Sequence, residues 1–123
     1  MQPDKLTQKS REALADAQQL AAQLGQQAIE LPHLMLALLR QQGGVVLPLL
    51  EKIGVRQEAL EGSLKAAAAR LPKVAGGEPY MGSTLNQALL EAQKHADQMQ
   101  DSYVSTEHLL LAVAASSKCS VET

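Results

Sequence analysis

The sequence contains no tryptophan and no phenylalanine, and its only aromatic residues are Tyr80 and Tyr103. The β-branched residues that favour strands are also scarce. Hydrophobic residues nevertheless make up 46% of the 123 positions, which is enough for a core and argues against a disordered chain. A core without large rings must come from close contacts between alanine and leucine, so an all-α fold is expected.

A single cysteine, Cys119, excludes an internal disulfide and favours a reducing compartment. The net charge is −2, and no cluster of lysine or arginine indicates a nucleic-acid partner. The longest strongly apolar stretch, residues 34–39, is far too short to span a bilayer, and the N-terminus does not read as a signal peptide. We therefore expect a cytoplasmic protein that binds neither nucleic acid nor membranes.

Apolar residues recur at intervals of three and four in six segments, as they do on the buried face of a helix. The chain length fits one domain, so these helices are expected to share a core. Asp4 or Thr7 is expected to cap the first helix, and Ser83 and Ser105 to cap the last two. Glycine-rich residues 73–82 are expected to form a linker. The expected helices cover residues 7–25 (or 4–25), 32–43, 46–53, 56–71, 83–99 and 106–116.

The sequence repeats itself with a shift of 75 residues. Between Ala13 and Ala37, 10 of 25 positions are identical to their counterparts, where ordinary composition would give roughly two or three. A helical unit of this kind cannot bury its apolar face alone, and pairing two copies completes a core and leaves a seam between them. In each copy the most apolar helix is expected to be central, with these leucines buried: Leu34, Leu36, Leu109 and Leu111.

Several segments of the two copies resemble the Clp N-terminal repeat family. They are LT at 6–7, EAL at 12–14 and HLM at 33–35. RLPKV at 70–74 and YVSTEHLL at 103–110 resemble the linker and second repeat of ClpB-type disaggregases in particular. The resemblance covers essentially the whole chain, but the TEHLL run is shared with protease-linked Clp ATPases.

The resemblance implies two pseudo-twofold-related four-helix repeats that form one compact N-terminal domain. The first repeat would span residues 1–72 and the second residues 83–123, with residues 73–82 as the linker. The register places Pro48 on Thr123, so the third helix has no counterpart and the second repeat is expected to be incomplete.

The resemblance also implies a homohexamer that carries AAA+ ATPase modules and works with a DnaK-type chaperone. ATP and Mg²⁺ would bind in those modules. No Gly-x-x-x-x-Gly-Lys-Ser/Thr motif occurs in this chain, so we expect no enzyme activity, cofactor or metal here. The implied role is to bind exposed apolar segments of unfolded or aggregated polypeptides and pass them to the pore. One alternative is the adaptor-binding N-domain of a ClpA- or ClpC-type unfoldase, and another is a purely structural helical spacer.

The same resemblance implies that Thr7, Asp101 and Glu107 form a polar cluster for substrate. Local chemistry gives another interpretation, because Thr7 can cap the first helix and Glu107 can complement the dipole of the sixth. We expect a shallow groove along the seam, with these three residues at its rim.

Adjacent leucines on the fifth helix cannot both face the core. Leu89 aligns with Leu14 in the repeat whereas Leu90 aligns with Ala15, so Leu89 is expected in the core and Leu90 at the surface. Leu90 would then form the floor of the groove, and Tyr80 and Met81 would enter it from the linker.

His33 and His108 are equivalent in the repeat, which raises the question of a metal site. Neither histidine has cysteine, histidine or carboxylate neighbours at ligand spacing. Each lies in the first turn of a helix, where an imidazole can form hydrogen bonds locally. No sequence context supports a Ser-His-Asp catalytic arrangement or a catalytic role for Cys119.

Overall fold

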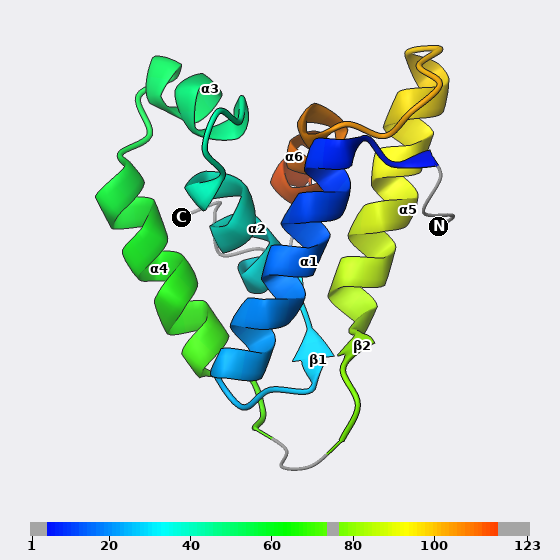
Figure 1. The fold of residues 1–123 in the computed structure, drawn as a ribbon. Helices are drawn as coiled ribbons and strands as arrows, with labels where there is room; N and C mark the ends of the chain where they lie inside the picture. Colours follow the sequence, from blue (N-terminus) through cyan, green and yellow to red (C-terminus); the bar gives the residue numbers. More distant parts are fainter. Residues whose placement is uncertain (1–4, 74–76, 116–123) are drawn as a thin grey trace.

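The computed structural model describes residues 5–73 and 77–115, which form six helices and two short strands (Figure 1). Cys119, Thr123 and the rest of 116–123 lie outside the described residues. Within the described ranges no helix is long and apolar enough to cross a membrane. In chain order the elements are α1 (Gln8–Gln23), β1 (Ala28–Ile29), α2 (Leu31–Arg40), α3 (Val46–Lys52), α4 (Gln57–Ala69), β2 (Tyr80–Met81), α5 (Ser83–Gln98) and α6 (Thr106–Ala115).

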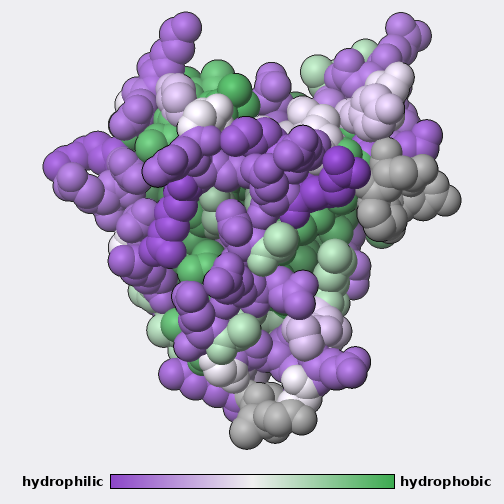
Figure 2. Space-filling view, in the orientation of Figure 1, coloured by the Kyte–Doolittle hydropathy of each residue, from purple (hydrophilic) through white to green (hydrophobic). Residues whose placement is uncertain are grey.

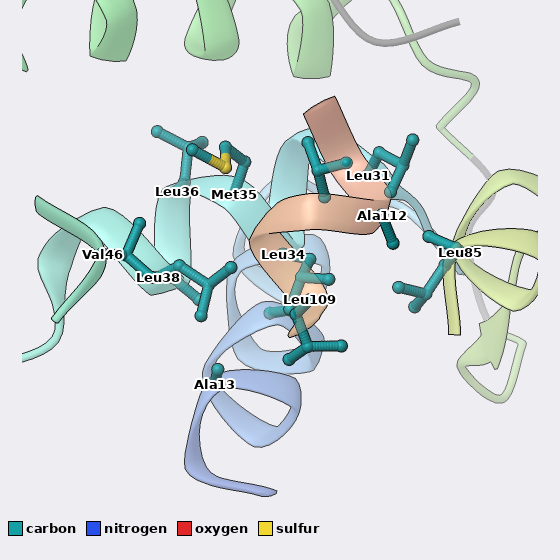
Figure 3. Packing of buried hydrophobic residues seen from close by; sticks show 14 of the residues in the cluster. Ala13, Leu31, Leu34, Met35, Leu36, Leu38, Val46, Leu85, Leu109 and Ala112 are labelled. Carbon is teal, nitrogen blue, oxygen red and sulfur yellow. The ribbon is translucent and has the colours of Figure 1, made fainter. Parts of the chain in front are cut away.

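The all-α prediction is confirmed, and the two copies pack in the same way. Helix α1 packs on α2 and α5 packs on α6, while α2 and α6 meet in the centre (Figure 1). Leu34 of α2 and Leu109 of α6 are completely buried there, together with Leu85 of α5 and Ala13 of α1 (Figure 3). The two most apolar helices therefore form the middle of the core.

Alanine allows the outer helices to approach this centre closely. Each of α1 and α5 presents three alanines at intervals of four residues, and none of the six is more than 4% exposed. The two sets are related by the 75-residue shift. They are Ala13, Ala17 and Ala21 in α1 and Ala88, Ala92 and Ala96 in α5.

The backbones of the two repeats pair with each other at two places. Ile29 of β1 pairs with Met81 of β2, and Leu6 pairs with Val104 in an isolated bridge. The shift of 75 converts one pair into the other, since it carries Leu6 to Met81 and Ile29 to Val104. The segment before the first helix of each repeat thus contacts the segment before the second helix of the other, as a pseudo-twofold axis requires.

Two sequence expectations need correction in the linker and at the start of α5. Residues 80–81 form a strand, because the Tyr80 N–H donates to Gln27 and the Gly82 N–H donates to Ile29 (3.0 and 2.9 Å). The N-cap of α5 is Gly82, and Ser83 is already the first helical residue. A strand of two exposed residues has no alternating pattern, so periodicity does not predict it.

Leu111 was expected to be buried and is 45% exposed. Its counterpart Leu36 is only 2% exposed, as α3 and α4 both pack on α2. Among the described residues no helix after α6 covers α6 in the same way. The prediction is confirmed for Leu34, Leu36 and Leu109. It is wrong for Leu111, because the helices that cover Leu36 have no counterpart among the described residues of the second repeat.

Candidate functional site

Thr7 lies where the two repeats meet. Its hydroxyl accepts the Ser10 N–H at 3.2 Å, which confirms the predicted cap of α1. Its own N–H donates to the Val104 carbonyl at 3.1 Å, and the buried Ser10 hydroxyl donates to the same carbonyl at 2.9 Å. Thr7 is therefore fixed against the segment that leads into α6. Asp101 lies in that segment, and Glu107 lies in the first turn of α6.

Asp101 is placed by the way α5 ends. Gln100 adopts a left-handed conformation (φ 60°), and the Asp101 N–H then donates to Ala96 at 2.8 Å. The first repeat ends α1 in the same way, with Gly25 at φ 71° and the Gln26 N–H donating to Ala21. A non-glycine residue at this position is strained, so the turn before Asp101 is held at some energetic cost.

The Asp101 side chain is held by His108. The Ser105 N–H donates to Nδ1 of His108 at 2.8 Å, so the ring proton must be on Nε2. Nε2 then donates to Oδ2 of Asp101, also at 2.8 Å. The imidazole is only 3% exposed, whereas the Asp101 side chain is 47% exposed. A buried donor thus holds a carboxylate at the surface.

Ser105, His108 and Asp101 are aligned in the order of a catalytic triad, since the Ser105 hydroxyl lies 3.0 Å from Nδ1. The geometry is nevertheless that of a helix cap, because the backbone N–H of Ser105 occupies the Nδ1 lone pair that a general base needs. The first repeat has the same cap without a serine, with the Glu30 N–H donating to His33 at 2.9 Å. The predicted local hydrogen bonds of both histidines are confirmed.

Within the described part of the chain, no three histidine, cysteine or carboxylate side chains lie close enough to hold a metal ion.

Glu107 is exposed in the first turn of α6, where its charge complements the helix dipole. Thr7, Asp101 and Glu107 therefore belong to one end of the seam.

The predicted orientation of the two leucines on α5 is confirmed. Leu89 is 3% exposed and packs in the core, whereas Leu90 is 60% exposed. In Figure 2 apolar surface appears between α1 and α5 and also over α3, on a face that is otherwise largely hydrophilic. Leu90 is thus a large apolar side chain at the surface of α5.

Tyr80 and Met81 do not join the other predicted residues. Strand β2 lies before the first turn of α5 and Asp101 follows its last turn, so a helix of 16 residues, about 24 Å long, separates them (Figure 1). Tyr80 is 56% exposed and lines a separate hollow of about 140 Å³ beside Leu71 and Pro72. The pseudo-twofold axis explains the separation, because Met81 is the counterpart of Leu6 at the opposite end of the seam.

Sequence reasoning considered His108 for metal binding and for local hydrogen bonds, and it missed the contact of His108 with Asp101. The register contained a signal, since the 75-residue shift aligns Asp101 with Gln26 and Ser105 with Glu30. His33 contacts Gln26 through Nε2 at 2.6 Å, as His108 contacts Asp101. The same three positions therefore form the same contacts in both repeats: Gln26, Glu30 and His33 in the first, and Asp101, Ser105 and His108 in the second.

Comparison with known proteins agrees with this architecture. The model of the family described as the Clp repeat (R) N-terminal domain matches residues 5–122. The chain belongs to the Clp repeat N-terminal domain family. Its curated relatives include chaperone protein ClpB of Nitratidesulfovibrio vulgaris, 39% identical over 110 residues that cover 85% of this chain. ClpB of Bacillus cereus is 38% identical over 117 residues, 91% of this chain.

The chain therefore matches the N-terminal domain of ClpB-type chaperones, and it spans only 13% and 14% of the length of these two relatives. Solved structures share the Clp repeat fold. The N-terminal domain of the ClpV1 ATPase from E. coli has a TM-score of 0.82 at 24% identity and covers 89% of this chain and 68% of its own. The Hsp104 N-terminal domain from Candida albicans has a TM-score of 0.78 at 23% identity, over 88% of this chain and 72% of its own.

Proposed function

We propose that this domain binds exposed apolar segments of unfolded or aggregated polypeptides and passes them to the AAA+ pore of a ClpB-type disaggregase. The observation that carries the proposal is the exposure of Leu90, which is 60%, beside a core to which it contributes nothing. Unfolded chains differ from native proteins in presenting apolar side chains. An exposed leucine on a rigid helix suits such a ligand without requiring a particular sequence.

The polar residues at the end of the seam suit the backbone of the same ligand. Asp101 and Glu107 are exposed carboxylates, and each can accept hydrogen bonds from the N–H groups of an extended chain. Thr7 is bonded to Val104, which lies between these two residues in the chain. Apolar contact at Leu90 with hydrogen bonds to main-chain groups would make capture tolerant of sequence.

The names of the relatives favour a disaggregase over the adaptor-binding unfoldase, because the curated proteins quoted above are both ClpB chaperones. By that relationship we propose that the whole protein is a homohexameric ATPase that works with a DnaK-type chaperone in the cytoplasm. ATP and Mg²⁺ would bind in its ATPase modules. This domain would contribute recognition of the polypeptide and no chemistry.

Fluorescence anisotropy with labelled α-lactalbumin tests the proposal, using the reduced, carboxymethylated chain and the native protein as a matched pair. We expect a dissociation constant of roughly micromolar or weaker for the unfolded chain, on the order of −6 to −8 kcal/mol, since a tighter complex would oppose release. Apolar binding should persist when the salt is raised from about 50 to about 300 mM. Equal binding of the native protein, or complete loss of binding in salt, would refute the proposal.

A further inference from the structure

The His108 ring joins the two elements that carry the polar end of the site. Its Nδ1 accepts the N–H of Ser105 at the start of α6, and its Nε2–H donates to Asp101 in the turn after α5. Both distances are 2.8 Å, and the ring is 3% exposed. The ring is too buried for a polypeptide to reach it, so His108 can affect binding only through the groups that it holds, Ser105 and Asp101.

The first repeat shows what this arrangement does when its role is only structural. There the residue opposite the histidine is Gln26, which is 4% exposed. Its side-chain amide accepts from His33 and also donates to the Ala68 and Leu71 carbonyls at the end of α4 (2.6 and 3.3 Å). The amide is needed because it must both accept and donate, and its hydrogen bonds point into the protein.

A carboxylate at the equivalent place cannot donate. Asp101 accepts the histidine N–H as Gln26 does, but its side chain is 47% exposed to solvent. A hydrogen bond to an ionised oxygen is stronger than one between neutral groups, so the carboxylate is held in one orientation before any ligand arrives. Ordering a side chain in advance removes part of the entropy cost of binding, which is worth roughly two- to tenfold in affinity.

We infer that His108 is the positioning residue of this site, and that it fixes the Asp101 carboxylate toward the bound polypeptide. The inference rests on the proposed function, since it requires Asp101 to contact the ligand. His33, with its bond to the buried Gln26, has the same local structure without this role.

Four variants test the inference by their affinity for reduced, carboxymethylated α-lactalbumin, with circular dichroism as the check of folding. Asp101→Ala removes the carboxylate and His108→Leu removes the donor, and each should weaken binding roughly two- to tenfold. The double variant should bind no more weakly than Asp101→Ala alone, since the histidine acts only through the aspartate. His108→Gln should stay within about twofold of the parent, because an amide can accept from Ser105 and donate to Asp101.

The failures of the two proposals are distinguishable. If Asp101→Ala weakens binding while His108→Leu does not, or if the two losses multiply, the positioning role is wrong and the site remains. If Asp101→Ala binds as well as the parent, Asp101 is not a contact, and the site fails together with this inference.

If His108→Leu does not fold, NMR of the parent decides the matter. The Nε2–H signal of His108 should move when unfolded α-lactalbumin is added, whereas that of His33 should stay in place. Equal behaviour of the two histidines would overturn the inference.

Discussion

At the scale of single residues, the buried histidine of the first repeat links the structure to pH. His33 accepts from the Glu30 N–H and lies 2.6 Å from the Gln26 amide oxygen, so its ring is neutral with the proton on Nε2. Burial lowers the pKa of His33 below the ordinary value of 6.5, and the nearby charge of Glu30 opposes this only in part. Protonation would also destroy the bond to Glu30, because Nδ1 would lose its lone pair.

Below about pH 6.5 the unfolded chain binds a proton at His33 more readily than the folded chain does, so the stability contributed by the neutral ring is lost as the pH falls. We expect the urea midpoint to fall between pH 7.5 and pH 5.5. His33→Gln, which keeps an acceptor for Glu30 but does not titrate, should lose less over the same interval. An equal loss in both proteins would show that His33 does not cause it.

Some residue roles could be predicted because they depend on near neighbours alone. The cap at Thr7 and the opposite facing of Leu89 and Leu90 are of this kind, and both are confirmed. That Thr7 contacts Val104 could not be predicted, because the contact depends on how two repeats dock across 97 positions of sequence. The grouping of Tyr80 with Thr7 had the same weakness, since sequence order says little about which end of a seam a segment reaches.

At the scale of elements, one joint between the repeats is the N-terminus of α5. The Thr84 hydroxyl donates to the Glu30 carboxylate at 2.5 Å, and that carboxylate fills the space in front of Gly82. A Cβ atom on Gly82 would lie 2.1 Å from carboxylate atoms of Glu30. A side chain at position 82 would therefore have to displace the end of the Glu30 side chain, although the backbone at φ −71° would itself tolerate other residues.

Gly82→Ala should displace the Glu30 carboxylate, break its bond to Thr84 and cost about 0.5–1.5 kcal/mol in the free energy of unfolding. Gly62→Ala is the matched control, since Gly62 lies exposed within α4 and an added Cβ would meet nothing within 4 Å. It should raise stability by about 0.5–1 kcal/mol through helix propensity. Urea denaturation of both variants measures the difference. If the two substitutions act alike, the packing of Glu30 on Gly82 does not hold the repeats together.

Element types and boundaries followed from periodicity, and burial followed only in part. The four expected leucines have the same local pattern, yet Leu111 is exposed because burial depends on which helix covers a face. Strand β2 could not be predicted for a related reason, since two residues become a strand only when β1 of the other repeat lies beside them. In both cases the outcome depends on a neighbouring helix or strand, and the sequence of the element itself does not specify that neighbour.

At the scale of the whole molecule, duplication explains both the core and the site. Two helix pairs bury Leu34 of α2 and Leu109 of α6 in a shared core, and their backbones pair with each other at both ends of the seam. The two ends have diverged. One is closed by Gln26 beneath α4, and the other presents Asp101 to solvent. We propose that the open end of this symmetric scaffold is where the polypeptide binds.

The most direct test of this account is the affinity of Leu90→Asp for reduced, carboxymethylated α-lactalbumin, with Leu111→Asp as the control. Both leucines are exposed, at 60% and 45%, so both variants should keep their helical signal and a stability within about 1 kcal/mol of the parent. Loss of an apolar contact of leucine size should weaken binding by Leu90→Asp at least about tenfold. Leu111→Asp, on a different helix, should stay within about twofold of the parent. A folded Leu90→Asp domain that binds as well as the parent would contradict the account.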